Sequence, residues 1–317
     1  MSVVPPRTWR FVQLGFGLVV VAATITIVGT GPLIQGVLAV SPAAILLAGA
    51  FTAIATLAAS WRWKTVSGAL GLPISWTTAV TAYYRSQFLN TVLPGGVIGD
   101  VHRAYRQGRH GGARNGDQNV ELLGAGRAVA TERVAGQVVQ GALTVVVLAV
   151  LGLTGSLLGV VWIGAGVLAV VAVALSVTAA TVSGRRLLGR ELSLLRLTFG
   201  SAKRSLSIVV ASALVVAAHS ATFVVACLAV GVGASPRELV ALAVVALAAA
   251  ALPLSIGGWG PREAASASAF AIVGLSAGAG LAASTAFGVL TMVSVLPGLI
   301  VLIVEWAAIR SRAVSAA

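Results

Sequence analysis

The sequence predicts an all-α bundle of transmembrane helices, with about six full spans and two re-entrant or broken elements. Apolar residues make up 58% of the chain and charged residues only 9%, and the mean hydropathy is +1.01. A soluble domain has about a quarter of its residues charged, so this chain has too little polar surface to face water. Its apolar residues also form runs of about 20, the length that crosses a bilayer.

Six apolar runs are long enough to be full spans. They cover residues 11–29, 37–60, 128–150, 159–182, 207–231 and 283–306. The first run follows two arginines as a signal peptide would, but no small-residue cleavage pattern comes after it, so we interpret it as an uncleaved span. We expect a single integral membrane domain over residues 1–317.

The basic residues orient these spans. They lie in short segments between the runs, and these segments alternate with nearly uncharged ones at 29–36, 151–158 and 231–238. The basic segments contain Arg7 and Arg10, then Arg62 and Lys64, then Arg103, Arg106, Arg109, Arg114 and Arg127, then six basic residues in 184–206, and finally Arg310 and Arg312. Cytoplasmic loops carry the excess of Lys and Arg. We therefore expect a multi-pass protein of the cytoplasmic membrane with both termini cytoplasmic, and no binding to nucleic acid despite the net charge of +13.

The first interrupted element covers residues 74–98. The basic segments on both sides of it are expected to be cytoplasmic, so the element must enter the membrane and return. Its break contains Pro94, Gly95 and Gly96, and proline and glycine both destabilise a helix interior. Irregular backbone at membrane depth is tolerated only where it is buried in protein or lines a wet cavity.

The second interrupted element covers residues 239–281, with a break that contains Pro253, Gly257 and Gly258. The sequences from Ser235 to Glu238 and from Gly260 to Glu263 are typical helix starts. The apolar leg before the break would form about 21 Å of helix, which is less than the roughly 30 Å of a bilayer core. We favour a re-entrant pair, and two full spans remain the alternative.

The two breaks resemble each other. Residues 93–103 align without gaps to residues 252–262, with identical Leu, Pro, Gly and Arg at four of eleven positions. Broken helices at corresponding places in inverted halves are typical of transporters and indicate the binding site. The halves would be residues 1–155 and 156–317, although chance could also produce this number of matches.

Several polar residues near the breaks are candidates for binding an anion. Arg85 lies within a membrane segment, where a charge costs at least about 2.5 kcal/mol, so it must face protein, water, a ligand or the headgroup region. A guanidinium can hold a phosphate through two hydrogen bonds. Gln87 and Asn90 follow on the same segment. Arg262 and Glu263 lie where a helix restarts, and the N–H groups there favour an anion, with simple capping as the alternative for Glu263.

Glu132 and Arg133 are neighbours on one helix, so their side chains diverge and each is expected to have another partner. We also expect Asp100 to be a helix N-cap and Glu305 to pair with an arginine. The predicted substrate-binding residues are therefore Arg85, Gln87, Asn90, Glu132, Arg133, Arg262 and Glu263. Residues 184–206 are predicted to be an amphipathic basic segment on the cytoplasmic surface.

The sequence contains no nucleotide-binding loop, zinc motif or nucleophile elbow. With only eight carboxylates in the whole chain, we expect no catalytic residue, no metal site and no cofactor. Cys227 is the single cysteine, so no disulfide can form within the chain.

Together these motifs resemble the transmembrane region of lysylphosphatidylglycerol synthases and the stand-alone flippase-like family that shares it. The resemblance depends on residues 85–90, on 93–96 followed by Gly99, Asp100 and Arg103, on Glu132-Arg133 followed by Gly136, and on 253–263. It implies a bundle that moves a polar or anionic phospholipid, or a lipid-linked headgroup, between the leaflets of the cytoplasmic membrane.

The synthases continue from the membrane region into a cytoplasmic aminoacyl transfer domain, whereas this sequence ends at Ala317. The resemblance therefore implies translocation rather than lipid synthesis. The alternative is a membrane-embedded transferase that acts on a lipid-linked substrate. The expected partners are membrane lipids, with a second copy of the chain or another membrane protein as further options.

Overall fold

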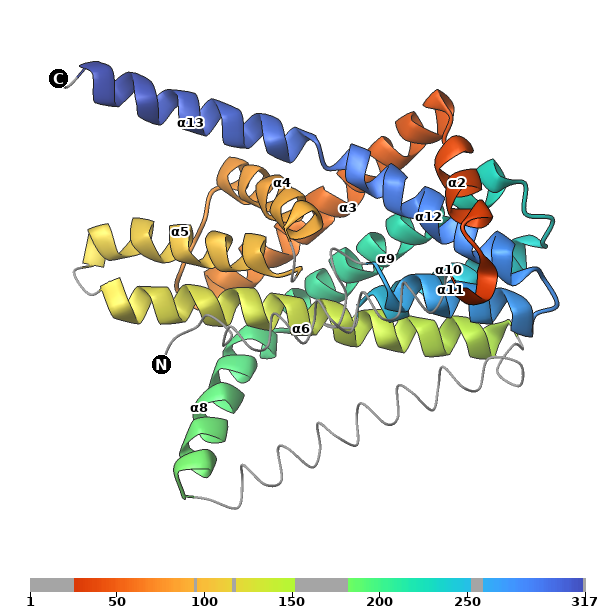
Figure 1. Ribbon diagram of the computed structural model, residues 1–317. Helices are drawn as coiled ribbons and strands as arrows, with labels where there is room; N and C mark the ends of the chain where they lie inside the picture. The colour runs from red at the N-terminus through yellow and green to blue at the C-terminus, as the bar shows by residue number, and fades with distance from the viewer. Residues whose placement is uncertain (1–25, 94–95, 116–117, 152–181, 252–258, 316–317) are drawn as a thin grey trace.

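The computed structural model describes residues 26–93, 96–115, 118–151, 182–251 and 259–315. Over these residues the chain folds into α-helices, with no strand among them, and this confirms the all-α prediction (Figure 1). The helices are α2 (Gly31–Leu38), α3 (Pro42–Ala69), α4 (Trp76–Val92), α5 (Ile98–Asn115), α6 (Gln118–Val150), α8 (Val182–Phe199), α9 (Ala202–Val230), α10 (Pro236–Ala250), α11 (Pro261–Ile272), α12 (Ala277–Ser294) and α13 (Pro297–Ser315). The predicted spans at 11–29 and 159–182 lie almost entirely outside the described residues.

Four helical segments of the described chain are long and apolar enough to cross a membrane. They are Pro42–Ala69, Glu121–Val150, Ala202–Val230 and Ala277–Ala308, and they correspond to the other four predicted spans. Large apolar side chains such as Leu46, Leu228 and Ile300 remain exposed on their outer surfaces. An apolar surface of this extent is typical of a protein that contacts lipid.

The packing inside the bundle depends on small residues. The main core lies mostly on α9, α10 and α12, with further residues from α3, α6 and α11, and nearly half of its buried residues are alanines. The rings of Phe223 and Phe287 are in contact there, with 5.6 Å between their centroids. Since lipid tails are as apolar as the core, membrane helices associate through close packing, which small side chains allow.

Three predicted boundaries are wrong. Helix α3 continues to Ala69, so residues 61–64 are helical and not a loop. Helices α5 and α6 likewise occupy most of the predicted basic loop at 103–127. The predicted span at 283–306 begins earlier, at Ala277, and is interrupted before Pro297, which has no N–H to continue the helix. In the first two cases the sequence predicted a loop because charge clusters usually face water, whereas here the helical charges have partners.

Helices α4 and α5 form the first interrupted element. Helix α4 starts after Ser75, whose Oγ accepts the Thr78 N–H at 3.1 Å, and its 17 residues span about 25 Å. The hairpin begins and ends at the same end of the bundle, the end where α6 begins (Figure 1). The expected return of the chain is therefore confirmed. Pro94 and Gly95 lie outside the described residues, and Gly96 next to them has a positive φ of 62°.

Helices α10 and α11 form the second interrupted element and lie side by side, entering from the opposite end of the bundle (Figure 1). The predicted helix starts are confirmed: Ser235 and Glu238 form a capping box, and the Gly260 N–H donates to Glu263 Oε2 at 2.6 Å. With 15 and 12 residues, the two helices span only about 22 and 18 Å. These lengths favour the re-entrant form over two full spans. The break residues Pro253, Gly257 and Gly258 lie outside the described residues.

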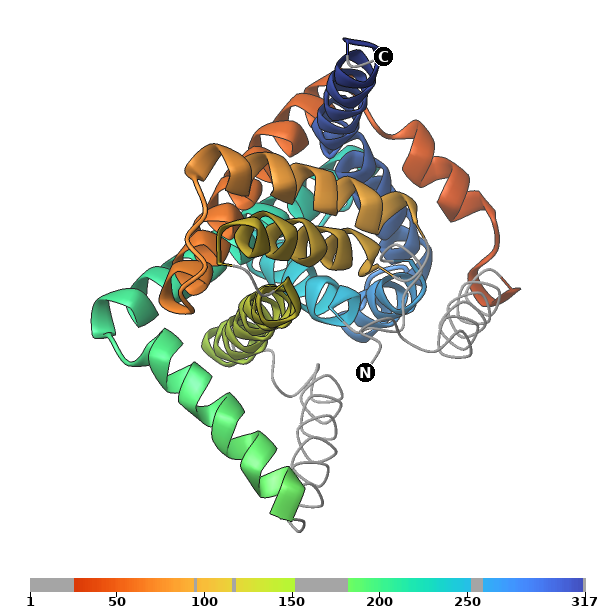
Figure 2. The ribbon, with the colours of Figure 1, turned by 90° about the vertical axis from the view of Figure 1, so that its left-hand side faces the viewer.

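Helix α8 occupies most of the predicted amphipathic segment and extends away from the bundle (Figure 2). Figure 2 faces the end of the bundle at which α5 ends and α6 begins. This end, which we call the basic end, carries the site described next.

Candidate functional site

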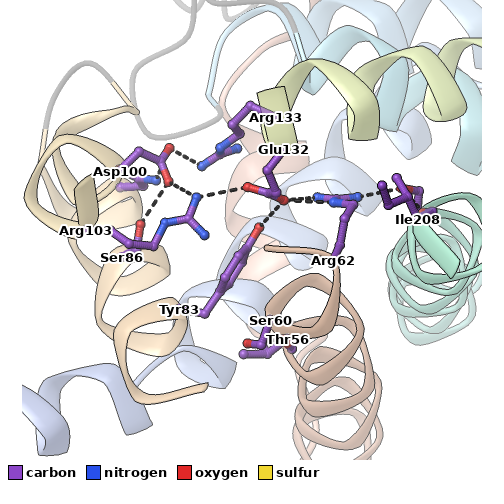
Figure 3. Close-up of polar contacts among 12 residues, drawn as sticks. Thr56, Ser60, Arg62, Tyr83, Ser86, Asp100, Arg103, Glu132, Arg133 and Ile208 are labelled. Carbon is purple, nitrogen blue, oxygen red and sulfur yellow. Dashed lines mark hydrogen bonds and ion pairs between the residues drawn. The ribbon is translucent and has the colours of Figure 1, made fainter. Parts of the chain in front are cut away.

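A network of charged side chains, most of them buried, surrounds Glu132 on α6 (Figure 3). Glu132 Oε1 accepts hydrogen bonds from Arg62 Nε at 2.8 Å, from Arg62 Nη2 at 2.5 Å and from the Tyr83 hydroxyl at 3.1 Å. Its other oxygen, Oε2, accepts from Arg103 Nη2 at 3.0 Å. As expected, Glu132 pairs with residues other than Arg133.

Asp100 on α5 is the second acidic centre of this network. Its oxygens accept from Ser86 Oγ at 3.0 Å, from Asn90 Nδ2 at 3.1 Å and from Arg103 Nη2 at 3.1 Å, and it forms an ion pair with Arg133. The predicted N-cap role of Asp100 is wrong because α5 begins at Ile98, two residues earlier. The carboxylate instead neutralises arginines from its own helix and from α6.

The network connects five helices. Arg62 comes from α3, Tyr83 from α4, Arg103 from α5 and Glu132 from α6, while Ser212 on α9 accepts from Arg62 Nη1 at 2.9 Å. Three arginines face two carboxylates, so the group keeps an excess positive charge. Removing one partner of a buried pair typically costs about 3–5 kcal/mol. The network therefore holds the α4–α5 hairpin against the spans.

Arg103 also contacts a cavity at the basic end. Its guanidinium lies 4.5 Å from the ring centroid of Trp63 and 4.4 Å from that of Tyr83, which is cation–π geometry. The Nε and Nη1 atoms are buried and have no hydrogen-bond partner among the described residues. Arg103 thus retains donor groups that the protein leaves unused.

The cavity has a volume of about 550 Å³, within the range of roughly 300–1,000 Å³ of small-molecule sites. Its lining combines apolar residues with three arginines and two glutamates. The lining residues are Trp63, Gly71, Leu72, Pro73, Ile74, Thr78, Thr81, Ala82, Arg85, Arg103, Arg106, Gln107, Glu121 and Glu305.

Arg85 is buried at this cavity and pairs with α13. Its Nη1 donates to Glu305 Oε1 at 2.5 Å, and Arg106 donates to the other oxygen of the same carboxylate. The expected pairing of Glu305 with an arginine is therefore confirmed. The Nε of Arg85 is buried and has no partner among the described residues.

The other predicted residues of α4 have structural contacts. Gln87 Oε1 accepts from Thr56 Oγ1 at 2.9 Å, which ties α4 to α3. Asn90 Oδ1 accepts the Gly99 N–H at 2.7 Å while its Nδ2 donates to Asp100. Asn90 thus closes the turn of the hairpin. Both side chains lie outside the lining of the cavity.

Arg262 and Glu263 form a separate buried cluster with α12. Arg262 Nη2 donates to Glu263 Oε1 at 2.6 Å, and Ser284 Oγ donates to the same oxygen at 3.0 Å. The guanidinium lies near the rings of Trp259 and Phe287, at 5.2 and 5.0 Å. Glu263 therefore both caps α11 and pairs with Arg262, and the structure places this pair in a different part of the bundle from Arg85.

Sequence reasoning did not select Arg62, Tyr83, Arg103 or Arg106 as site residues. The spacing of Asp100, Arg103 and Arg106 was an available signal, because residues three apart share one face of a helix. For Arg62 no local signal existed, since its partners Glu132 and Ser212 are 70 and 150 residues away. Among the described residues, no three His, Cys, Asp or Glu side chains gather as metal ligands.

Comparison with known proteins supports the resemblance. No curated protein and no solved structure matches the chain significantly. The family model described as the lysylphosphatidylglycerol synthase TM region matches residues 10–298. The match includes both interrupted elements and the whole Glu132 network. The chain therefore belongs to the lysylphosphatidylglycerol synthase transmembrane-region family, whose members are membrane proteins linked to lipid handling.

Proposed function

We propose that this protein moves a polar, anionic phospholipid or lipid-linked headgroup across the cytoplasmic membrane. The basic end faces the cytoplasm, both chain termini lie on that side, and the headgroup enters the cavity there while the acyl chains stay in the bilayer. The observation that carries the proposal is the cluster of Arg85, Arg103 and Arg106 in the lining of this cavity.

The chemistry of these arginines suits a lipid phosphate. A guanidinium binds a phosphate through paired, charge-assisted hydrogen bonds. Arg85 Nε and Arg103 Nη1 are buried donors without partners among the described residues, and leaving such donors unpaired is unfavourable. An anionic ligand in the cavity would offset the excess positive charge of the lining.

The second cluster supports a path beyond the cavity. A charged headgroup that crosses hydrocarbon without partners pays a large desolvation cost. The Arg262–Glu263 pair is buried within the element that enters from the opposite end of the bundle. We assign this pair to a second polar position that the headgroup passes on its way between leaflets.

Movement of fluorescent phosphatidylglycerol in proteoliposomes tests the proposal. Losing a hydrogen bond to a charged group costs about 1.5–3 kcal/mol, so Arg85→Ala should slow the movement roughly 10- to 100-fold. Arg262→Ala should slow it as well. Arg127→Ala is the matched control, because Arg127 pairs with Glu191 where both side chains are about 40% exposed, and it should move lipid at the wild-type rate.

Equal rates in all four proteins would contradict the proposed path. Gel filtration of each variant must show the same elution profile, so that a slow rate reports the site and not loss of fold. Lipid extracts should contain the same species before and after incubation. A new, covalently changed lipid would instead support the alternative of a membrane transferase.

A further inference from the structure

Glu305 pairs with two of the arginines to which the proposed function assigns headgroup binding. Its carboxylate is held by Arg85 and Arg106 together, and all three side chains line the cavity. Glu132 is likewise held by two arginines, but the two carboxylates differ in access to solvent. The Glu132 side chain is fully buried, whereas that of Glu305 is 30% exposed. Glu305 can therefore be replaced by another anion, while Glu132 cannot.

The helix that carries Glu305 is joined to the rest of the bundle through a break in the helical pattern. The α-helical pattern is interrupted at Val295 and Leu296, between α12 and α13, and Pro297 follows. Near this break Gly298 packs closely against α4 at Tyr84 and Phe88. Beyond it α13 extends past the bundle (Figure 1), and the Glu305 ion pairs connect this distal part to the α4–α5 hairpin.

Moving α13 would expose little new apolar surface to water. Ile300, Ile303, Val304 and Trp306 are already exposed on it, and in a bilayer these side chains contact lipid in either position. Membrane helices gain no hydrophobic driving force from association, because lipid is as apolar as the partner helix. Polar contacts such as the two ion pairs of Glu305 therefore decide where the distal part of α13 lies.

We propose that Glu305 is a displaceable counter-ion that couples occupation of the cavity to the position of α13. An anionic lipid phosphate replaces the Glu305 carboxylate on Arg85 and Arg106. Helix α13 is then released, pivots at Val295 and Leu296, and opens the cavity sideways to the bilayer. The exchange is balanced because one anion replaces another on the same two guanidinium groups. This inference rests on the proposed function, since it uses the same cavity.

The distance between two spin labels tests the coupling. The native Cys227 is buried, so Cys227→Ala provides a background for labels at Ser311 on α13 and Lys203 on α9, two exposed positions. In phosphatidylcholine nanodiscs we expect one distance population. Phosphatidylglycerol should add a second population, and Glu305→Gln should show that second population already in phosphatidylcholine.

Binding of short-chain phosphatidylglycerol to detergent-solubilised protein gives an independent measure. A ligand binds more weakly when its site is open for only part of the time. If Glu305 fills the site for about nine tenths of the time, Glu305→Gln should bind this lipid about ten-fold more tightly. Glu191→Gln is the matched control, because Glu191 also pairs with an arginine but lies outside the cavity. It should change neither the distances nor the affinity.

The other possible results separate this inference from the proposed function. Unchanged distances in all samples, or no gain in affinity for Glu305→Gln, would overturn the inference. Release of α13 by inorganic phosphate in phosphatidylcholine nanodiscs would overturn the assignment to a lipid. If the protein moves lipid while α13 stays fixed, the proposed coupling is wrong but the proposed function stands. If lipid releases α13 but no lipid is moved across the membrane, the proposed function is wrong but the coupling stands.

Discussion

Glu132 is fully buried, and Arg62, Arg103 and Tyr83 donate hydrogen bonds to its two oxygens. A buried ion pair contributes little net stability, but removing one partner destabilises the protein because the other charge is left buried and unpaired. The residue therefore acts as a structural centre on which three helices other than its own converge. Arg103 shares its guanidinium between Glu132, Asp100 and two aromatic rings.

Replacing Glu132 by Gln tests this role. The amide keeps the shape of the side chain but leaves Arg62 and Arg103 without a counter-charge, so we expect a loss of about 3–5 kcal/mol in stability. Thermal unfolding in one detergent should show a clearly lower midpoint than for the wild type. Glu191→Gln is the control, because exposed ion pairs contribute at most about 1 kcal/mol. Similar midpoints for the two variants would argue against the network.

At the scale of single elements, α6 approaches the Arg62 side chain at Gly136. A Cβ atom at this position would lie 2.8 Å from Arg62 Nη1. The guanidinium cannot move aside without losing hydrogen bonds to Glu132 and Ser212. Absence of a side chain at Gly136 is therefore a requirement of the network.

Gly136→Ala should destabilise the protein by about 1–3 kcal/mol, the usual cost of overpacking. The control is Gly141→Ala on the same helix, where a Cβ would meet nothing within 4 Å. Since alanine is the better helix former by about 0.5–1 kcal/mol, this second variant should unfold at the same or a higher temperature. A stabilised Gly136→Ala variant would show that Arg62 is free to shift.

Gly298 allows α13 to pack closely against α4, because a Cβ atom there would collide with the carbonyl oxygen of Tyr84. Gly298→Ala should push α13 outward and weaken the Arg85–Glu305 pair. The distance between labels at Ser311 and Lys203 should then lengthen or broaden in phosphatidylcholine nanodiscs. Gly49→Ala, which meets nothing within 4 Å, should leave the distance unchanged. If both variants retain the wild-type distance, the contact at Gly298 does not position α13.

At the scale of the whole molecule, the two interrupted elements enter the bundle from opposite ends (Figure 1). The α4–α5 hairpin belongs to the basic end with the cavity, and the α10–α11 pair belongs to the other end. The positive-inside rule predicts that the first of these ends faces the cytoplasm.

Cysteine labelling tests this topology in the Cys227→Ala background. Thr77, Arg109 and Gly233 are exposed positions, and a side chain at Gly233 would meet nothing within 4 Å. A membrane-impermeant maleimide should react with Thr77→Cys and Arg109→Cys only from the cytoplasmic side, and with Gly233→Cys only from the outside. Labelling of Thr77→Cys and Arg109→Cys from opposite sides would mean that the α4–α5 element crosses the membrane once.

The sequence by itself determined that the chain is an all-α membrane protein, that two elements are interrupted, and that Glu132, Arg133 and Glu305 need partners elsewhere. These properties depend on local quantities: hydropathy over about 20 residues, proline and glycine at a break, and the cost of a charge in an apolar run. The positions of the basic segments were sufficient to predict that the α4–α5 hairpin returns to the end of the bundle where it begins.

Only the tertiary structure decided which charges meet. Arg62 was predicted to lie in a loop, but it is a buried partner of Glu132. Glu305 pairs with Arg85, which is 220 residues away in the sequence. Arg85 and Arg262, which were both predicted to bind the substrate, belong to separate clusters. The reason is that such pairings depend on the register and crossing of packed helices. That register is set by close contacts between small residues far apart in the chain, and no local pattern records it.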